Sequence, residues 1–151
     1  MFLLLTVFSC NPTKYIPQGE TLLDQNYVKI NNGNLKKSEI YPLIRQKPNK
    51  KIFGVRFHLG LYNLSNLDKE KWPHSWLRNI GEEPVVFDIN AVEKSKEQIK
   101  SYLISKGYFD GNVTETVETM GKKSKVYFEI NLNAPYTIHD IKYDIEDITI
   151  A

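Results

Sequence analysis

The chain has 151 residues, enough for one compact domain with short appendages but too few for two full domains with an enzyme-sized cleft between them. Its 20 basic and 18 acidic residues give a net charge of +2, and 41% of the residues are hydrophobic and 25% charged, as in an average soluble domain. This composition excludes a disordered, collagenous or polytopic membrane protein. A net charge of +2 provides little field for binding a polyphosphate, so nucleic acid is not expected as a partner.

An apolar run covers residues 2–8, and Ser9 and the only cysteine, Cys10, follow it. The run is far shorter than the roughly 18 residues that span a bilayer, but it fits the hydrophobic region of a signal peptide. An aliphatic residue stands at −3 and a small one at −1 before Cys10, which resembles the lipobox of bacterial lipoproteins. That resemblance implies a signal peptide over 1–9 and a lipidated Cys10. The alternative is a buried N-terminal strand that carries an incidental cysteine.

A tether and a first strand are expected next. Residues 11–20 contain prolines and a glycine without an apolar period, and the folded part is expected to begin near Leu22. Alternating residues over 27–30 predict a short strand, which ends at the turn-forming residues 31–34.

A short helix is then expected in a basic region. Apolar spacing predicts that this helix starts near Glu39 or Ile40, with Pro42 in its first turn. Residues 36–56 hold seven basic side chains against one acidic one. Such a surface can bind acidic lipid headgroups or phosphates, but it is more often simply solvated, so we assign it no chemistry.

The middle of the chain is rich in aromatic residues. Residues 52–64 are apolar with two glycines and indicate no clear element, whereas Trp72 and Trp76 predict an amphipathic helix over about 69–79, closed by Gly81. The two tryptophans have two interpretations. They are anchors at a membrane interface, or they pack in the core, and the i, i+4 spacing favours the core.

The second half predicts a long helix. Asn90 with Glu93 has the pattern of a capping box, and Gly107 has the position of a C-terminal glycine in the left-handed conformation. The intervening apolar stripe is Val92, Ile99 and Leu103. These features predict a helix of about four turns.

Two alternating segments complete the pattern. Residues 112–120 and 126–132 alternate on either side of a turn at 121–123, which predicts a β-hairpin. The order of elements is then strand, helix, aromatic segment, helix, strand, strand. It predicts an α+β fold in which helices cover one face of a three-stranded sheet.

No catalytic or metal-binding pattern is present in the sequence. His58, His74 and His139 are scattered without metal-ligand spacing, and no nucleophile elbow, P-loop or dinucleotide motif occurs. Caps, turns and exposed strand positions account for the acidic residues Asp88, Asp110, Glu115 and Glu118. We therefore expect no enzyme, no cofactor and no metal.

The segment 102–109, followed by a hairpin rich in Val and Thr, resembles a POTRA domain. POTRA domains are the β-α-α-β-β modules in front of the barrel in BamA/TamA-like outer-membrane assembly proteins. A narrower resemblance is to the N-terminal region of TamL-type lipoproteins of Bacteroidetes-type bacteria. It rests on four stretches in order, at 10–17, 45–49, 59–65 and 76–84.

The resemblance implies a lipid-anchored protein on the periplasmic side of the outer membrane. Its partners would be the outer membrane, unfolded outer-membrane protein clients, and a C-terminal barrel or assembly partner. These 151 residues do not supply the strands of a barrel, so we interpret the chain as the N-terminal portion of a longer protein or as a truncated relative. The expected organisation is a signal peptide over 1–9, a lipidated tether over 10–21, a POTRA-like domain over 22–134, and the first strand of a second such unit within 135–151.

The resemblance also implies the strand order first, third, second, which makes the strand over 112–120 an edge. Its backbone is expected to bind extended clients by β-augmentation, with two acidic side chains guarding against self-association. The edge residues are Val113, Thr114, Glu115, Thr116, Val117 and Glu118. Two alternatives remain: an ordinary edge that binds nothing, and a structural or adaptor lipoprotein that braces a partner.

Overall fold

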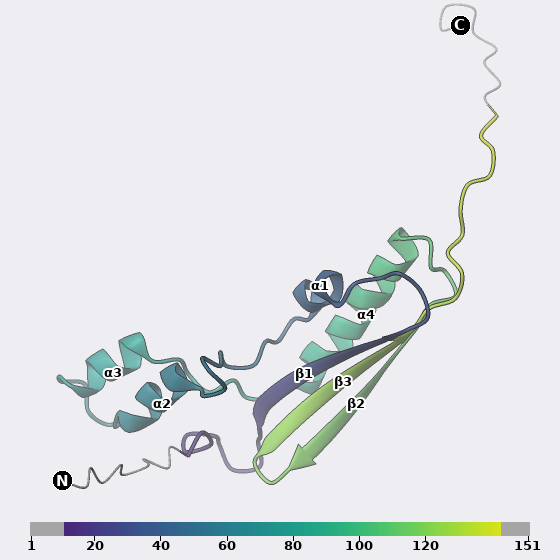
Figure 1. Ribbon diagram of the computed structural model, residues 1–151. Helices are drawn as coiled ribbons and strands as arrows, with labels where there is room; N and C mark the ends of the chain where they lie inside the picture. The colour runs from purple at the N-terminus through teal and green to yellow at the C-terminus, as the bar shows by residue number, and fades with distance from the viewer. Residues whose placement is uncertain (1–10, 143–151) are drawn as a thin grey trace, which may run out of the picture.

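The structure is a computed structural model that describes residues 11–142. Strands β1 (Leu22–Asn31), β2 (Asn112–Met120) and β3 (Lys123–Asn131) form one sheet in the order β1-β3-β2. As Figure 1 shows, β3 is central, parallel to β1 and antiparallel to β2. The α+β class, the strand order and the edge position of 112–120 are therefore confirmed.

The first strand is longer than the predicted 27–30. The prediction missed its start, where two consecutive leucines are fully buried on opposite sides of the chain. Leu23 joins the main core and Leu22 a second cluster, so burial on both faces hides the period-2 signal at this end. The third strand begins three residues before the predicted Val126.

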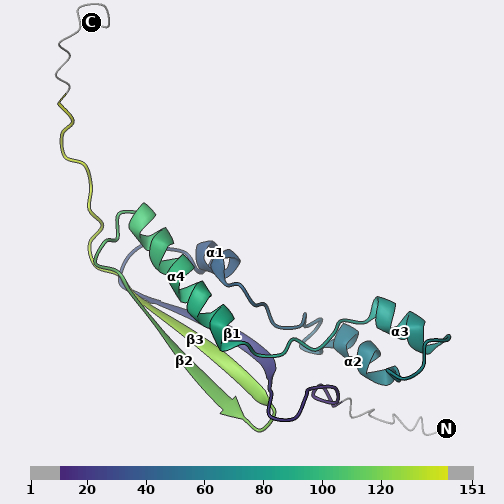
Figure 2. The same ribbon diagram turned by 180° about the vertical axis from the view of Figure 1, so that it is seen from behind.

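Two helical segments cover one face of the sheet, as Figure 2 shows. They are the short α1 (Lys37–Ile40), continued by a 3₁₀ turn (Tyr41–Leu43), and the long α4 (Ile89–Ser105). The α-helix was predicted to start near Glu39 or Ile40, with Pro42 in its first turn. It begins earlier, at Lys37, and ends before Pro42, which lies in the 3₁₀ turn. The core between the layers contains Leu23, Val28, Ile40, Ile44, Val92, Ile99, Leu103, Val113, Val126, Phe128, Ile130 and Leu132.

Both ends of α4 are capped by local hydrogen bonds. The Asp88 carboxylate accepts from the backbone N–H of Asn90 at 2.9 Å, so Asp88, and not the predicted Asn90, is the N-cap. At the other end, Gly107 has φ 86°, and its N–H and that of Tyr108 donate to the carbonyls of Ile104 and Leu103. This is a Schellman motif, and the predicted role of Gly107 is confirmed.

Helices α2 (Phe57–Leu64) and α3 (His74–Ile80) pack on each other as a helical hairpin at one end of the sheet (Figure 1). A Cβ at Gly81 would lie 2.7 Å from the backbone nitrogen of Tyr62, so the close approach of the two helices requires glycine. Helix α3 begins after Pro73, not at residue 69, because proline disfavours the helical conformation in the residue before it. Trp72 therefore lies outside the helix.

The segment expected to form a tether is held against this helical hairpin. Ile16 is buried with Leu22 and Leu59 in a small second core. The Asn63 side chain donates to the Asn11 carbonyl at 3.0 Å, and the Tyr15 hydroxyl donates to the Ser65 carbonyl. Sheet and helical hairpin thus share a core that the segment before β1 completes.

Residues 133–142 contain no helix or strand. The N–H of Tyr136 donates to the Gly107 carbonyl at 2.8 Å, and beyond this contact the side chains of Ile138 and Ile141 are exposed. The segment at Tyr136 and Ile138, which resembles the first strand of a further unit, forms no strand over 133–142, as expected of a strand with no pairing partner among the described residues. The rest of that segment, 143–151, together with the predicted signal peptide 1–9 and Cys10, lies outside the described residues.

Among residues 11–142, no helix combines the length and apolar character that crossing a membrane requires.

Candidate protein-binding surfaces

The outer edge of β2 is the surface at which the sequence places client binding. On its other side β2 pairs with β3 along its whole length. In the described part of the chain, no backbone hydrogen bond joins residues 112–120 to any segment other than β3. An unpaired strand edge is a template for a further extended segment.

The register fixes which backbone groups of β2 point outward. Met120 pairs with Lys123 across a two-residue turn, and such flanking residues form a hydrogen-bonded pair. Since hydrogen-bonded and non-hydrogen-bonded pairs alternate in antiparallel sheets, the outward N–H and C=O groups belong to Val113, Glu115, Val117 and Thr119. Thr114, Thr116 and Glu118 direct their backbone groups toward β3.

The predicted edge residues divide between the two faces of the sheet. Val113 is buried beneath α4, Val117 is half-buried, and Glu115 lies in the same row. The Glu115 carboxylate lies 2.9 Å from Lys96 Nζ of α4, and this hydrogen bond raises the pKa of Lys96. Glu115 therefore links the edge strand to α4, and its carboxylate lies on the helix side of the sheet.

Glu118 lies on the opposite face, with Thr114 and Thr116. It accepts a hydrogen bond of 2.9 Å from the Tyr127 hydroxyl, which raises the pKa of that phenol. The Tyr127 ring stacks on Tyr27 with centroids 4.8 Å apart. Glu118 is exposed on the open face, the face of the sheet that no described helix covers, so of the two predicted guards only this one lies there.

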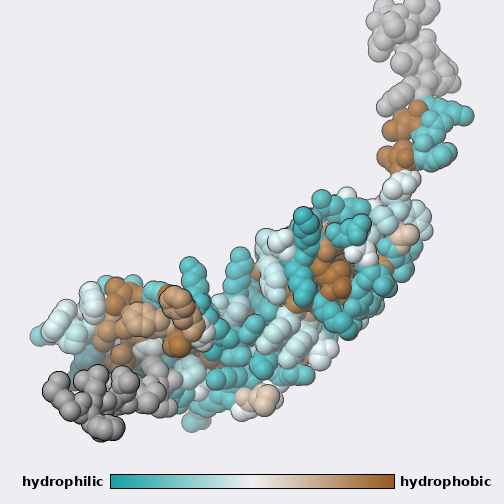
Figure 3. All heavy atoms as spheres, in the orientation of Figure 1, coloured by the Kyte–Doolittle hydropathy of each residue, from teal (hydrophilic) through white to brown (hydrophobic). Residues whose placement is uncertain are grey.

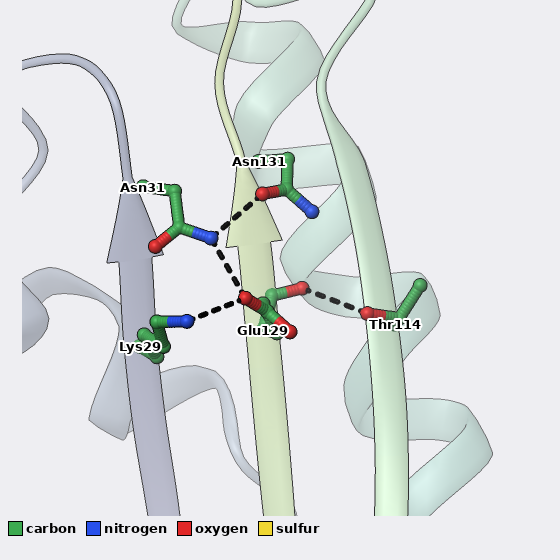
Figure 4. A network of polar contacts seen from close by, with 5 residues as sticks. All are labelled: Lys29, Asn31, Thr114, Glu129 and Asn131. Atoms are coloured by element: carbon green, nitrogen blue, oxygen red, sulfur yellow. Dashed lines mark hydrogen bonds and ion pairs between the residues drawn. The ribbon is translucent and has the colours of Figure 1, made fainter.

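A polar network joins all three strands on this open face (Figure 4). Glu129 of β3 accepts from Lys29 and Asn31 of β1, each at 2.8 Å, and its carbonyl accepts from Thr114 of β2 at 3.4 Å. The hydrogen bond from Lys29 and, to a smaller extent, that from Asn31 lower the pKa of Glu129. Asn31 also donates to Asn131 at 2.7 Å. The network fixes the open face as a polar, ordered surface.

The other edge strand, β1, is partly covered. Leu23 N–H donates to the Val85 carbonyl at 2.8 Å, and Phe87 N–H donates to the Thr21 carbonyl at 2.8 Å. Farther along β1, a cavity of about 560 Å³ separates the strand from the segment after α1. Its lining includes Asn26, Tyr41, Pro48, Lys50 and Lys51. This cavity gives the basic region a concave surface beside a strand edge, which the sequence did not indicate.

The acidic and histidine residues considered for catalysis do not converge. Asp88 caps α4, Asp110 accepts from the Tyr136 hydroxyl at 3.0 Å, and Glu115 and Glu118 have the partners given above. His74 Nδ1 accepts from the backbone N–H of Asn66. Over residues 11–142, no three His, Cys, Asp or Glu side chains gather in an arrangement that could hold a metal ion.

The helical hairpin carries an exposed apolar surface that contains both tryptophans, for which the sequence interpretation had favoured the core. Trp72 is 79% exposed and Trp76 52%, so the prediction that they pack in the core is wrong. Figure 3 shows apolar side chains gathered over α2 and α3. The exposed apolar side chains of the two helices and the loop between them are Phe57, Leu64, Leu67, Trp72, Trp76 and Ile80. Pro73 is the sequence signal that could have corrected this prediction. It excludes Trp72 from the helix, and the i, i+4 argument requires both tryptophans to lie in one helix.

The chain matches the POTRA family, described as "Surface antigen variable number repeat", over residues 26–146. Since the match covers most of the chain, and the fold is the expected sheet with helices on one face, the chain belongs to the POTRA family. POTRA domains are non-catalytic protein-binding modules of outer-membrane assembly systems. No curated protein and no solved structure matches the chain significantly.

Proposed function

We propose that this chain is a lipid-anchored, periplasmic POTRA module of the TamL type, which binds extended segments of outer-membrane protein clients along the outer edge of β2. The observation that carries the proposal is the row of outward backbone groups at Val113, Glu115, Val117 and Thr119, with no described chain beside them. Backbone pairing tolerates many client sequences, as a module that receives many different clients requires. The anchor is Cys10, and the location is the periplasmic side of the outer membrane.

On this proposal, side-chain charge lets the edge admit clients and disfavours pairing with a second copy. Lys96 holds Glu115 against the helix layer, while Glu118 places one negative charge on the open face beside the edge. In the register that sets Glu118 opposite its own copy, edge-to-edge pairing would bring two such charges together, whereas a client strand with a neutral or basic residue at that point would not.

The proposal is tested with a photo-crosslinking residue at Thr116 and an unfolded outer-membrane protein as client. We expect capture of the client at Thr116 and none at a control position, Lys100, which is exposed on α4. A second variant, Thr119→Pro, removes one outward N–H at an exposed edge position, where proline is tolerated. Capture should fall about fivefold, which corresponds to one backbone hydrogen bond of about 1 kcal/mol, and Thr119→Ala should leave it unchanged.

Capture at a probe on Lys50 or Lys51, with none at Thr116, would show that clients bind in the cavity beside β1 and that the β2 mechanism is wrong. Thr116→Pro is not a suitable test, because the N–H of Thr116 points toward β3 and its loss would damage the sheet itself.

A further inference from the structure

The loop between α2 and α3 and the helix ends beside it form an exposed apolar tip. We define the hairpin tip as residues 64–76. Its exposed apolar side chains are Leu64, Leu67, Trp72 and Trp76. An exposed group of large apolar side chains of this kind indicates an interaction surface, not solvated protein.

The composition of the hairpin tip favours a bilayer over a protein partner. Tryptophan has an apolar ring and one polar N–H, and it concentrates at the boundary between lipid headgroups and acyl chains. Lys69 and Lys71, both exposed, alternate with two acidic residues along the loop, so the tip carries no net charge from its Lys, Asp and Glu side chains. Lysine stems can lie along apolar surface while the ammonium groups reach the headgroups.

The start of the described chain is fixed next to this tip. Asn63, the residue before Leu64, donates to the carbonyl of Asn11, and Ser65 accepts from Tyr15. Lys14 Nζ donates to the Asn63 carbonyl at 2.7 Å. Asn11 thus lies beside the start of the hairpin tip. Because adjacent Cα atoms are 3.8 Å apart, Cys10 and the apolar run before it are joined to the protein next to the tip.

We infer that the hairpin tip rests on the phospholipid bilayer, with Trp72 and Trp76 in the interface. The inference goes beyond client binding and concerns a different part of the molecule, since β2 and the tip share no residue. This step rests on the proposed function, because the lipid at Cys10 would attach the chain without fixing the orientation of the domain, and a second contact with the bilayer would fix it. The tip supplies such a contact and sets the orientation of the domain.

The two tryptophans of the chain both lie in the hairpin tip, so intrinsic tryptophan fluorescence reports on the tip alone. The test uses the full chain with Cys10→Ser, which cannot be acylated, and vesicles of phosphatidylcholine or of phosphatidylethanolamine with phosphatidylglycerol. We expect a blue shift of the emission with both compositions, because the tip is neutral. Lipids brominated along the acyl chains should quench the emission.

Vesicle flotation then compares two matched double variants. Trp72→Ser with Trp76→Ser should lower the partition coefficient about tenfold or more. Met120→Ser with Ile138→Ser removes two apolar side chains that are 71% and 79% exposed but lie outside the tip, and it should leave partition unchanged. The apolar run 2–8 is common to all variants and cancels in the comparison.

Three results would overturn the inference: emission that does not respond to vesicles, an equal loss of partition in both double variants, or a blue shift that depends on protein concentration without lipid. The last would assign the tip to a second copy of the chain. None of these results bears on crosslinking at Thr116, so failure of this inference is distinguishable from failure of client binding.

Discussion

Gly107 meets two requirements at a single Cα atom. Its φ of 86° ends α4, and a Cβ at this position would lie 2.7 Å from the carbonyl oxygen of Tyr136. The sequence predicted the first requirement, since a glycine after the last apolar position of a helix has a known conformation. It could not predict the second, because the contact with Tyr136 joins segments 29 residues apart that share no pattern.

Gly107→Ala should destabilise the protein by about 2 kcal/mol, part from backbone strain and part from the contact with Tyr136. Gly54→Ala is the matched control, because Gly54 has a similar φ of 81° with no atom within 4 Å of its Cβ position. Urea denaturation followed by circular dichroism gives both values. Equal costs for the two variants would show that the Tyr136 contact contributes nothing to stability.

Side-chain partners account for other differences between sequence and structure at this scale. The sequence interpretation treated Glu115 as an exposed strand residue that guards the edge, because a pattern cannot show that Lys96 of α4 lies within hydrogen-bond distance of its carboxylate. Asp88 and Asn90 are both good N-cap residues, and the side-chain hydrogen bond that distinguishes them is not visible in a pattern.

Between elements, one ion pair fastens the helical hairpin to the sheet. Arg56, the N-cap residue of α2, donates to the Asp24 carboxylate of β1 at 2.7 Å and to the Asp24 carbonyl. Both side chains are largely buried. Burial alone would raise the pKa of Asp24, but the hydrogen bond and the charge of Arg56 together hold it below its usual value.

A carboxyl group with a lowered folded-state pKa contributes stability above its unfolded pKa, and this stability is lost as the pH falls through the folded value. Asp24→Asn should therefore cost about 2 kcal/mol at pH 7, and the difference from wild type should shrink in acid, below the unfolded pKa of about 3.9. Glu129→Gln removes an exposed pair that solvent screens, so it should cost less than Asp24→Asn. Urea denaturation between pH 2 and pH 7 measures both (roughly the range over which carboxylates titrate). A pH-independent difference for Asp24→Asn would contradict this account.

The predictability of each element depended on how its residues are buried. Helix α4 and the β2–β3 hairpin each bury one face, so their periods identified them. Helix α2 has apolar residues on nearly all sides, and it contacts both α3 and the segment before β1. Residues 57–64 therefore show no single hydrophobic period in the sequence. The edge status of β2 depended on strand order, which came from the family resemblance and not from periodicity.

For the whole molecule, the two proposed membrane contacts, at Cys10 and at the hairpin tip, should act together. A Cys10→Ala chain should keep its fold but leave the membrane fraction during buffer washes, because the hairpin tip alone binds reversibly. The wild-type chain should need detergent for release and should carry an acyl mass on its N-terminus. Fractionation with mass spectrometry checks both, and wild-type protein in the wash without acyl mass would refute the anchor.

The parallel pairing of β1 with β3 determines how the domain responds to tension. The chain enters β1 at the end near the helical hairpin and leaves β3 at the opposite end, as Figure 1 shows. A pull between a fixed N-terminal side and a loaded C-terminal side would therefore slide the two strands past each other. Hydrogen bonds that cross from strand to strand would share such a force instead of opening one by one. Tension between the two ends of the domain would therefore act along its mechanically strongest direction.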